Sequence, residues 1–172
     1  MRIAGHGNKY ESNQETQSQS FGIGDPSVGI EILRNRLYEH KIRTLVQEYM
    51  SNARDAHREV GQTRRIEVVA PTQLEPTFKV RDFGPGISPD RMANVFVLYG
   101  ASTKRKNNTQ TGGFGIGAKS AWSYADGFII VSTTDGTRRT YHAHVGASNV
   151  GQLDLLETSE TKEPNGCEIQ IA

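Results

Sequence analysis

Two glycine clusters with a polar, basic segment between them are the feature that most constrains this chain. The first cluster spans residues 82–86 (DFGPG), and the second spans residues 112–117 (GGFGIG) and is followed by Lys119 and Ser120. Glycine permits positive φ and close backbone approach, and successive free N–H groups in such a loop form a cradle for anions. A helix that begins directly after the loop adds the positive end of its dipole. Each cluster taken alone is also compatible with an ordinary turn.

The bulk properties of the chain favour one intracellular domain. Its 172 residues suffice for one domain with a core, so we expect a single domain over residues 21–172. Residues 1–20 are polar and poor in apolar anchors, which indicates a flexible N-terminal arm. The net charge is +1 and no apolar run approaches the roughly 18–20 residues that span a bilayer, so there is no direct nucleic-acid or membrane signal. The single cysteine, Cys167, excludes an intrachain disulfide and suits a reducing compartment such as the cytoplasm.

The strongest helical pattern begins at residue 42 and ends near Gly61, which is a plausible C′ residue. Glu48, Asn52 and Asp55 fall within roughly 60° of one another on the helical wheel, at one edge of the apolar stripe. They therefore border both the core and a cleft in which a site can be built. A solvated helix face explains the same pattern. The apolar stripe follows i, i+3, i+4, i+7, i+8, i+11 spacing and consists of Ile42, Leu45, Val46, Tyr49, Met50 and Ala53.

The remaining patterns predict short helices and antiparallel strands. Alternating apolar and polar residues indicate strands over 65–69 and 77–82, which we expect to pair as a hairpin. Ser88 fits the N-cap of a short helix that continues through Leu98. The chain stops directly after its last expected strand, which indicates either a truncated C-terminal end or a compact domain. The other expected elements are an edge strand at 21–23, helices over 28–38 and 118–124, strands over 128–132, 139–145, 152–156 and 168–171, and a hairpin turn at Asp135-Gly136.

Several familiar motifs are approached but not met. Residues 113–120 differ from a phosphate-binding P-loop because Ala118 stands where the second glycine must be, and no strand precedes them. The same missing strand excludes a dinucleotide-binding fingerprint. The histidines show no metal-ligand spacing with a carboxylate or thiol, and we expect His142 and His144, on one strand face, to be ordinary surface residues. Cys167 is expected to be a core or pocket-wall residue rather than a nucleophile.

Three segments of the chain together resemble the GHKL ATPases in order and spacing. This superfamily contains gyrase-type topoisomerases, ninety-kilodalton heat-shock chaperones, sensor histidine kinases and MutL mismatch-repair proteins. The resemblance covers residues 42–171 and implies a two-layer α/β sandwich, with a mixed, mostly antiparallel sheet covered on one face by helices. The segments are Glu48-x-x-x-Asn52-x-x-Asp55-Ala56, Asp82-x-Gly84-x-Gly86 and Gly112-x-x-Gly115-x-Gly117.

A closer resemblance is to the N-terminal part of the phage rIIA protein family. It implies a phage-encoded protein that acts in the host cytoplasm, with phage or host proteins as partners. Fold analogy does not reveal the biological process. The residues that carry this resemblance are Leu37-Tyr38, Lys41-Ile42-Arg43, Asn52, Asp55-Ala56-His57, residues 81–86, residues 112–115 and Lys119-Ser120.

The superfamily resemblance implies a role for each acidic or amide residue of the first two segments. Glu48 would be the catalytic general base that orients and deprotonates the attacking water. Asn52 would supply a neutral oxygen to Mg²⁺, which takes the rest of its shell from water and phosphates. Asp82 would accept a hydrogen bond from the exocyclic amine of adenine and so select adenine over guanine. Asp55 would support the adenine-binding end of the site through a water molecule. Gly84 and Gly86 would let the chain pass flat against the base.

The phosphate end of the implied site comes from the second glycine cluster and a lid. Backbone N–H groups of residues 113–119 would bind the phosphates, with Lys119 or Lys104 as a point charge, and residues 93–111 would form a lid that closes over ATP. Many members of the superfamily have Gly-Thr before the last strand, whereas Gly166 is followed here by Cys167, which weakens or removes that contact. The expected ATP-binding set is Asn52, Asp55, Ala56, Asp82, Gly84, Gly86, Ile87, Met92, Ser102, Thr103, Lys104, Gly112, Gly113, Phe114, Gly115, Ile116, Gly117, Lys119 and Cys167.

The resemblance therefore implies a Mg²⁺-dependent module that binds ATP and hydrolyses it slowly. Lid closure would drive formation of a homodimer or engagement of a partner, with the polar arm as an exchanged strap. A non-enzymatic ATP sensor and an interaction protein whose pocket has drifted away from ATP are the alternatives. We do not expect a histidine kinase, because no phospho-acceptor histidine lies on a dimerising helix pair.

Overall fold

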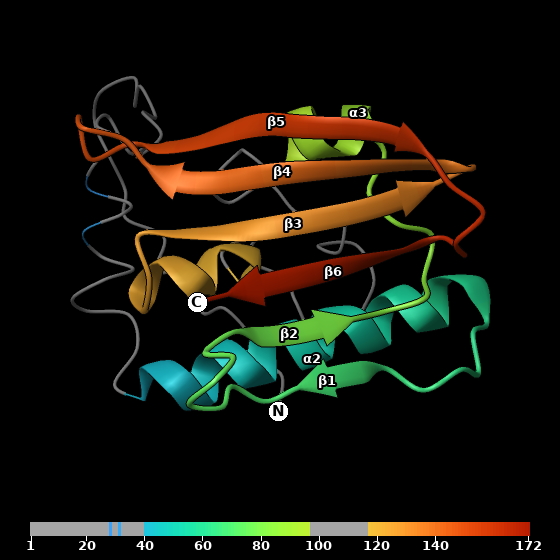
Figure 1. Ribbon diagram of the computed structural model, residues 1–172, viewed down its shortest axis with the longest axis horizontal. Helices are drawn as coiled ribbons and strands as arrows, with labels where there is room; N and C mark the ends of the chain where they lie inside the picture. The colour runs from blue at the N-terminus through green and yellow to red at the C-terminus, as the bar shows by residue number, and fades with distance from the viewer. Residues whose placement is uncertain (1–27, 29–30, 32–39, 97–116) are drawn as a thin grey trace, which may run out of the picture.

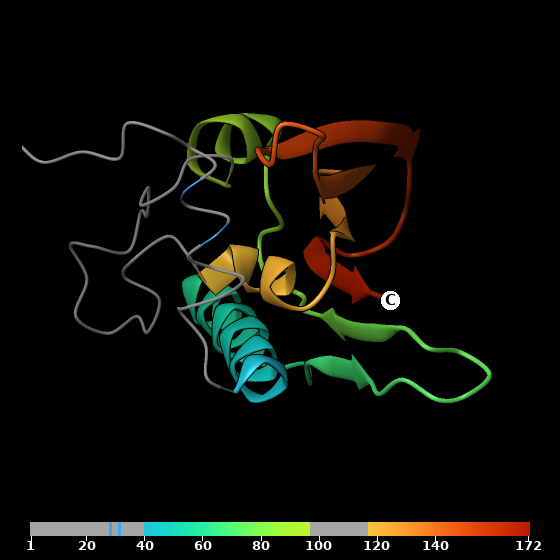
Figure 2. The ribbon, with the colours of Figure 1, turned by 90° about the vertical axis from the view of Figure 1, so that its left-hand side faces the viewer.

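A six-stranded sheet with helices on one of its faces makes up the part of the protein that the structure describes. The computed structural model describes residues 28, 31, 40–96 and 117–172. Figure 2 shows the helices gathered on one side of the sheet, so the expected two-layer α/β sandwich is confirmed. The expected strand at 21–23 and most of the helix at 28–38 lie outside the described residues, as does most of the lid.

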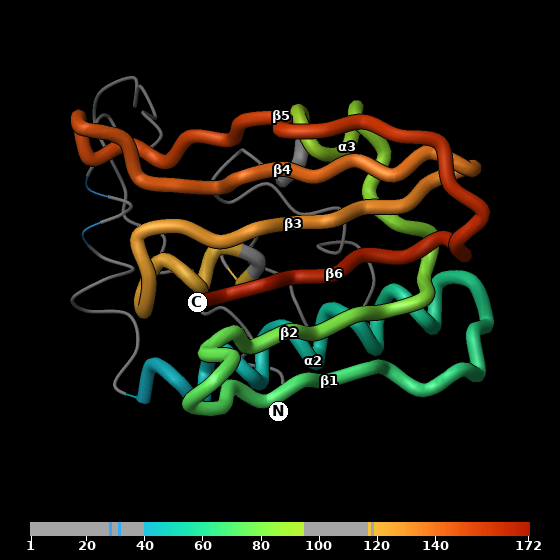
Figure 3. The backbone as a smooth tube through the Cα atoms, in the orientation of Figure 1, coloured from blue at the N-terminus to red at the C-terminus, as the bar shows by residue number. Residues whose placement is uncertain are grey.

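The sheet has the order β1-β2-β6-β3-β4-β5, and every neighbouring pair of described strands is antiparallel (Figure 1). The predicted hairpin pairing of β1 with β2 is confirmed. The last strand of the chain, β6, lies between β2 and β3 in the middle of the sheet (Figure 3). The strands are β1 (Glu67–Val69), β2 (Phe78–Arg81), β3 (Gly127–Thr134), β4 (Thr137–Val145), β5 (Gly151–Glu160) and β6 (Gly166–Ile171).

Helix α2 (Lys41–Val60) is the long helix that the apolar stripe predicts. Its residues Leu45, Tyr49 and Ala53 are buried against the sheet, whereas Ile42 in the first turn is exposed. The helix ends as expected at Gly61, which adopts a left-handed conformation with φ of 66°. None of the helices in the described part of the chain combines the length and apolarity needed to cross a membrane.

The shorter helices lie on the same face of the sheet, and the two longer of them are not α-helices. Ser88 caps α3 (Pro89–Arg91) through a hydrogen bond from the Arg91 N–H to its Oγ, 3.3 Å long, and the chain continues as a π-helix, η1 (Met92–Phe96). The helix expected at 118–124 is a 3₁₀-helix, η3 (Gly117–Ser123). The Ser123 hydroxyl donates to the Ser120 carbonyl, three residues back, at 2.7 Å.

The core lies between the helical layer and the sheet. The Tyr49 hydroxyl accepts a hydrogen bond from the Ala121 N–H, 3.3 Å long, which joins α2 to η3. Between the end of β3 and the beginning of β4, Asp135 and Gly136 have φ of 49° and 75° and form the predicted hairpin turn. The buried apolar side chains are Leu45, Tyr49, Ala53, Val80, Met92, Ala121, Trp122, Phe128, Ile130, Tyr141, Ala143, Ile169 and Ile171.

Candidate nucleotide site

Helix α2 presents Glu48, Asn52 and Asp55 on successive turns. Glu48 and Asn52 are half-buried, at the edge of the apolar stripe. Asp55 is 1% exposed, and its Oδ1 lies 3.9 Å from Nη1 of the partly exposed Arg58 one turn later. The alternative of a solvated helix face therefore does not describe this edge, because none of these three side chains is exposed.

The carboxylate of Glu48 packs directly against Gly117, the first residue of η3. A β-carbon built on Gly117 would overlap the Glu48 carboxylate and would lie 2.9 Å from its Cδ. Real β-carbons do not make such contacts, so this position requires glycine as long as Glu48 keeps its conformation. The structure thus brings together the first and third sequence segments, which are far apart in the chain.

The first glycine cluster is wedged between α2 and the sheet. A β-carbon on Gly84 would lie 2.7 Å from the Cβ of Ala56 and 2.8 Å from its carbonyl oxygen. Gly86 has φ of 73°, and a β-carbon there would overlap the Thr133 carbonyl oxygen of β3. Both positions therefore need glycine for close backbone approach, and Gly86 needs it also for its conformation. The second sequence segment consequently contacts the same helix as the third.

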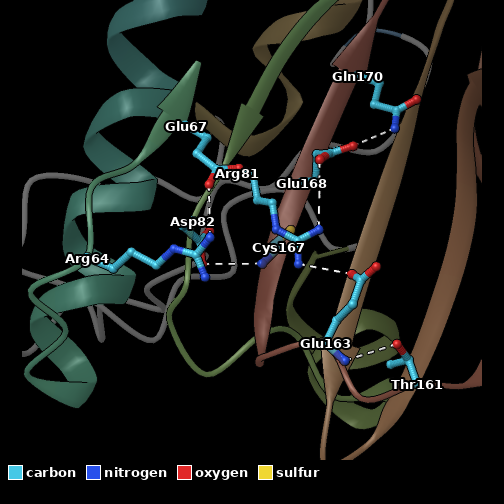
Figure 4. A network of polar contacts seen from close by, with 9 residues as sticks. All are labelled: Arg64, Glu67, Arg81, Asp82, Thr161, Glu163, Cys167, Glu168 and Gln170. Carbon is cyan, nitrogen blue, oxygen red and sulfur yellow. Dashed lines mark hydrogen bonds and ion pairs between the residues drawn. The ribbon is translucent and has the colours of Figure 1, made fainter. Parts of the chain in front are cut away.

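Asp82 lies buried at the end of β2, where it faces the beginning of β6. Its Oδ1 accepts hydrogen bonds from the main-chain N–H groups of Gly84 (2.9 Å) and Cys167 (3.2 Å). The Asp82 N–H in turn donates to the Cys167 carbonyl at 2.9 Å, and Figure 4 shows Asp82 beside Cys167. Burial raises the pKa of the Asp82 carboxyl. The two backbone hydrogen bonds and the nearby side chains of His57 and Arg81 oppose that rise. The carboxylate is therefore held in a fixed orientation by the protein backbone.

The neighbouring charges are arranged in pairs on the sheet beside this turn. Figure 4 shows the Arg81 guanidinium reaching Glu163, 3.0 Å away, and Glu168, 4.0 Å away. Arg64 pairs with Glu67 at 3.0 Å in the same view. Arg81 also helps to lower the pKa of the Asp82 carboxyl, in addition to its pairing with these two glutamates.

Residues at the C-terminal end of α2 hold the Asp82 turn, and sequence reasoning missed this function. The Phe83 N–H donates to Nε2 of the buried His57 at 2.8 Å, and the Gln62 side-chain amide donates to the Phe83 carbonyl at 3.1 Å. The Arg64 guanidinium lies 3.6 Å from the centre of the Phe83 ring. The only sequence signal was the position of His57 directly after Asp55 and Ala56.

Lys119 is a buried cation in η3, two residues after Gly117. Its side chain is 1% exposed, and burial lowers the pKa of its ammonium group from 10.5 to about 8. A buried cation of this kind beside a glycine-rich segment is suited to an anionic ligand, since a nearby anion favours its charged form.

The other expected site residues that the structure describes lie in the turn after Asp82, in η1 and at the beginning of β6. Ile87 exchanges two hydrogen bonds with the Ser132 hydroxyl of β3, at 2.8 and 3.0 Å, and Met92 is a core residue that is 2% exposed. Burial and the nearby carboxylates of Asp82 and Glu168 raise the pKa of the Cys167 thiol well above its usual value. Such a thiol is protonated at neutral pH, which favours a pocket wall over a nucleophile. Ser102, Thr103, Lys104, Gly112, Gly113, Phe114, Gly115 and Ile116 lie outside the described residues.

Fold and geometry together define a class of protein. A two-layer α/β sandwich whose long helix carries carboxylate and amide side chains and contacts glycines of two other segments is typical of a nucleotide-binding module. The model of the histidine kinase-, DNA gyrase B-, and HSP90-like ATPase family matches residues 40–169. Since this match covers most of the chain, the chain belongs to that family, the GHKL ATPases, and is an ATP-binding, ATPase-like module. No curated protein matches the chain significantly.

Proposed function

We propose that the protein binds ATP together with Mg²⁺ and hydrolyses it slowly, in a pocket formed by α2, the Asp82 turn and η3. The observation that carries this proposal is the double contact of α2: its Glu48 carboxylate packs against Gly117, while its Ala56 packs against Gly84. These two contacts bring Gly117 and the turn that contains Asp82 to the same helix as Glu48, which supports one pocket for the three segments.

Asp82 recognises the adenine in this proposal. Its Oδ1 accepts from the backbone N–H groups of Gly84 and Cys167, and we assign its Oδ2 to the exocyclic amine of the base. Guanine carries a carbonyl at that position, which would face the buried carboxylate and leave it without a donor. Leaving a charge buried and unpaired typically costs about 3–5 kcal/mol, so the preference for adenine is strong.

Glu48 and Asn52 act at the phosphate end. Both are half-buried oxygen-bearing side chains one helical turn apart, and oxygen donors of this kind fit Mg²⁺, with Asn52 as the protein ligand. Bound Mg²⁺ would supply positive charge that stabilises the negative charge developing during phosphoryl transfer. Glu48 orients the attacking water and accepts its proton. Lys119 supplies a point charge to the phosphates.

The biological setting that we propose is an rIIA-like phage protein in the host cytoplasm. The likeness of residues 81–86 and of Asp55-Ala56-His57 to that family supports it. Closure of the segment 93–111 over ATP drives homodimer formation or engagement of a phage or host protein. Light scattering of the full chain with a non-hydrolysable ATP analogue, with ADP and without nucleotide tests dimerisation. A mass that is the same in all three conditions removes the homodimer from the proposal.

The catalytic part is tested by phosphate release from radiolabelled ATP, with the wild type, Glu48→Ala and the control Glu59→Ala. Glu59 is an acidic residue of the same helix that is exposed and paired with Arg91 at 3.4 Å. We expect Glu48→Ala to lower the rate about 100-fold or more while leaving ATP affinity nearly unchanged, and we expect EDTA to abolish turnover. Equal rates in the wild type and Glu48→Ala would remove Glu48 as the base. Tight ATP binding with no turnover in the wild type would favour an ATP sensor instead.

A further inference from the structure

The two histidines of β4 lie on the face of the sheet that is turned away from the helices. They alternate along the strand with Tyr141 and Ala143, which are buried in the core. Since successive side chains of a strand point to opposite faces, His142 and His144 project from the outer face. Their rings stack with centroids 4.8 Å apart and an interplanar angle of 18°.

A carboxylate on the neighbouring strand completes this cluster. Asp154 of β5 is the direct cross-strand partner of His142, and its Oδ2 lies 2.8 Å from Nε2 of His144. One ligand atom from each of the three side chains lies within 4.8 Å of the others. The sequence did not reveal this arrangement, because only strand pairing brings Asp154 beside the histidines.

The strand on the other side leaves room for the imidazole rings. Gly127 of β3 is the cross-strand partner of His144. A β-carbon at Gly127 would lie 2.7 Å from Nε2 of His142 and 3.4 Å from Cβ of His144. The absence of a side chain at this position therefore lets the His142 ring lie over β3, with its Nε2 close to the sheet surface.

We propose that His142, His144 and Asp154 bind a first-row divalent transition metal of the Zn²⁺ type, with water in the remaining position. Two imidazoles and one carboxylate are a ligand set that Zn²⁺ uses in proteins. Tetrahedral coordination with bonds of about 2.0–2.1 Å sets ligand atoms about 3.3 Å apart, so small rotations of these side chains suffice. The metal joins β4 to the edge strand β5 and is separate from the Mg²⁺ of the proposed nucleotide pocket, because Mg²⁺ prefers oxygen ligands.

The ordinary alternative is a surface ion pair between His144 and Asp154. Such a pair uses only one of the two histidines and leaves the imidazole of His142 outside it. A metal, in contrast, uses both rings as neutral ligands and the carboxylate as the anionic one. A metal therefore accounts for the placement of all three side chains, whereas the ion pair accounts for two of them.

The test is a Co²⁺ titration of the full chain without nucleotide, followed by visible absorption, with Zn²⁺ as competitor and Mg²⁺ as a negative control. We expect one Co²⁺ per chain, displaced by Zn²⁺ and not by Mg²⁺. The variants His142→Ala, His144→Ala and Asp154→Asn should each weaken binding at least about tenfold. The controls His6→Ala and His40→Ala, which alter histidines outside the cluster, should bind as the wild type does.

A second measurement does not depend on whether the variants fold. In the NMR spectrum of the wild type, substoichiometric Co²⁺ should broaden the imidazole signals of His142 and His144 and leave those of His40 and His57 sharp. Absence of Co²⁺ uptake, uptake that survives all three substitutions, or broadening confined to other histidines would overturn the proposal and leave a surface ion pair.

Discussion

The carboxylate of Glu48 lies against the α-carbon of Gly117 so closely that no β-carbon fits between them. This contact joins the middle of helix α2 to the beginning of η3. The group that approaches Gly117 is the end of a side chain, so its position depends on the conformation of Glu48 as well as on the absence of a β-carbon at Gly117. Substitutions of Glu48 and of Gly117 test the two sides of this contact separately.

Replacing Gly117 with alanine should displace the Glu48 carboxylate and impair hydrolysis more than ATP binding. A displacement of about 1 Å typically costs about 100-fold in rate, and we expect a loss of that order. Phosphate release and calorimetric ATP titration measure the two effects. In the Glu48→Ala background the same substitution should cost nothing further, because the overlapping group is gone. The control Gly61→Ala, whose β-carbon would meet no atom within 4 Å, should cost about 1–2 kcal/mol of stability through its left-handed conformation and leave turnover of the folded protein nearly unchanged.

Replacing Gly84 with alanine should destabilise the fold. The new β-carbon would lie 2.7 Å from the Cβ of Ala56 and 2.8 Å from its carbonyl oxygen, and overpacking of this kind costs about 1–3 kcal/mol. Urea denaturation measures the change in the free energy of unfolding. Adding Ala56→Gly should restore only part of the loss, because the carbonyl contact remains. A Gly84→Ala protein as stable as the wild type would show that α2 and the Asp82 turn are not in close contact.

His57→Phe should weaken both the fold and ATP binding. The phenyl ring fills similar space but cannot accept the hydrogen bond from the Phe83 N–H, which is then buried without a partner at a cost of about 1–3 kcal/mol. Since Phe83 follows Asp82 directly, we expect ATP affinity to fall several-fold as the turn loosens. His40→Phe, at an exposed position before α2, is the matched control. Unchanged stability and affinity in His57→Phe would mean that this hydrogen bond does not position the turn.

The burial of Lys119 makes a pH-dependent contribution to stability. The pKa of its ammonium group is about 8 in the fold against an ordinary value of 10.5, so the folded protein binds fewer protons than the unfolded chain between these values. The cost of burying the charge is fully present below pH 8, on the order of 3 kcal/mol, and is relieved as the pH rises toward 10.5. Without ATP, the free energy of unfolding of the wild type relative to that of Lys119→Met should therefore rise between pH 8 and pH 10. A difference in the free energy of unfolding between the two proteins that does not change with pH would exclude the Lys119 ammonium group as the cause.

The same group should couple ATP binding to protonation. Phosphates near Lys119 favour its charged form, so ATP affinity of the wild type should be highest below about pH 8 and decline above it. Calorimetry across pH 7–10 measures the decline, and in Lys119→Met it should be absent. A wild-type affinity that does not change over this range would argue against a phosphate contact by Lys119.

Local features of the fold could be predicted from the sequence because neighbouring residues determine them. The stripe containing Leu45, Tyr49 and Ala53 specified α2, and Gly61 ended it. Asp135-Gly136 specified the β3–β4 turn because both residues tolerate positive φ. The superfamily resemblance identified the helix and the two glycine clusters, and the structure brings Glu48 to Gly117 and Ala56 to Gly84.

The remaining features depend on contacts between residues distant in the chain. The central position of β6 follows from its pairing with both β2 and β3, which no local pattern specifies. The tighter geometry of η3 accompanies the contact between Gly117 and Glu48, and the hydrogen bond from Phe83 to His57 links positions 26 residues apart. Asp154 likewise meets His142 and His144 only through strand register.

The most direct test of the proposed pocket is a calorimetric titration of wild type and Asp82→Asn with ATP and GTP in the presence of Mg²⁺. Asparagine retains an oxygen for the Gly84 and Cys167 N–H groups, so the fold should persist, but its amide presents a donor where the carboxylate presented an acceptor. We expect the wild type to bind ATP and to exclude GTP. Asp82→Asn should lose at least about tenfold in ATP affinity and gain in relative preference for GTP. Equal ATP affinity in the two proteins would contradict recognition of adenine by Asp82.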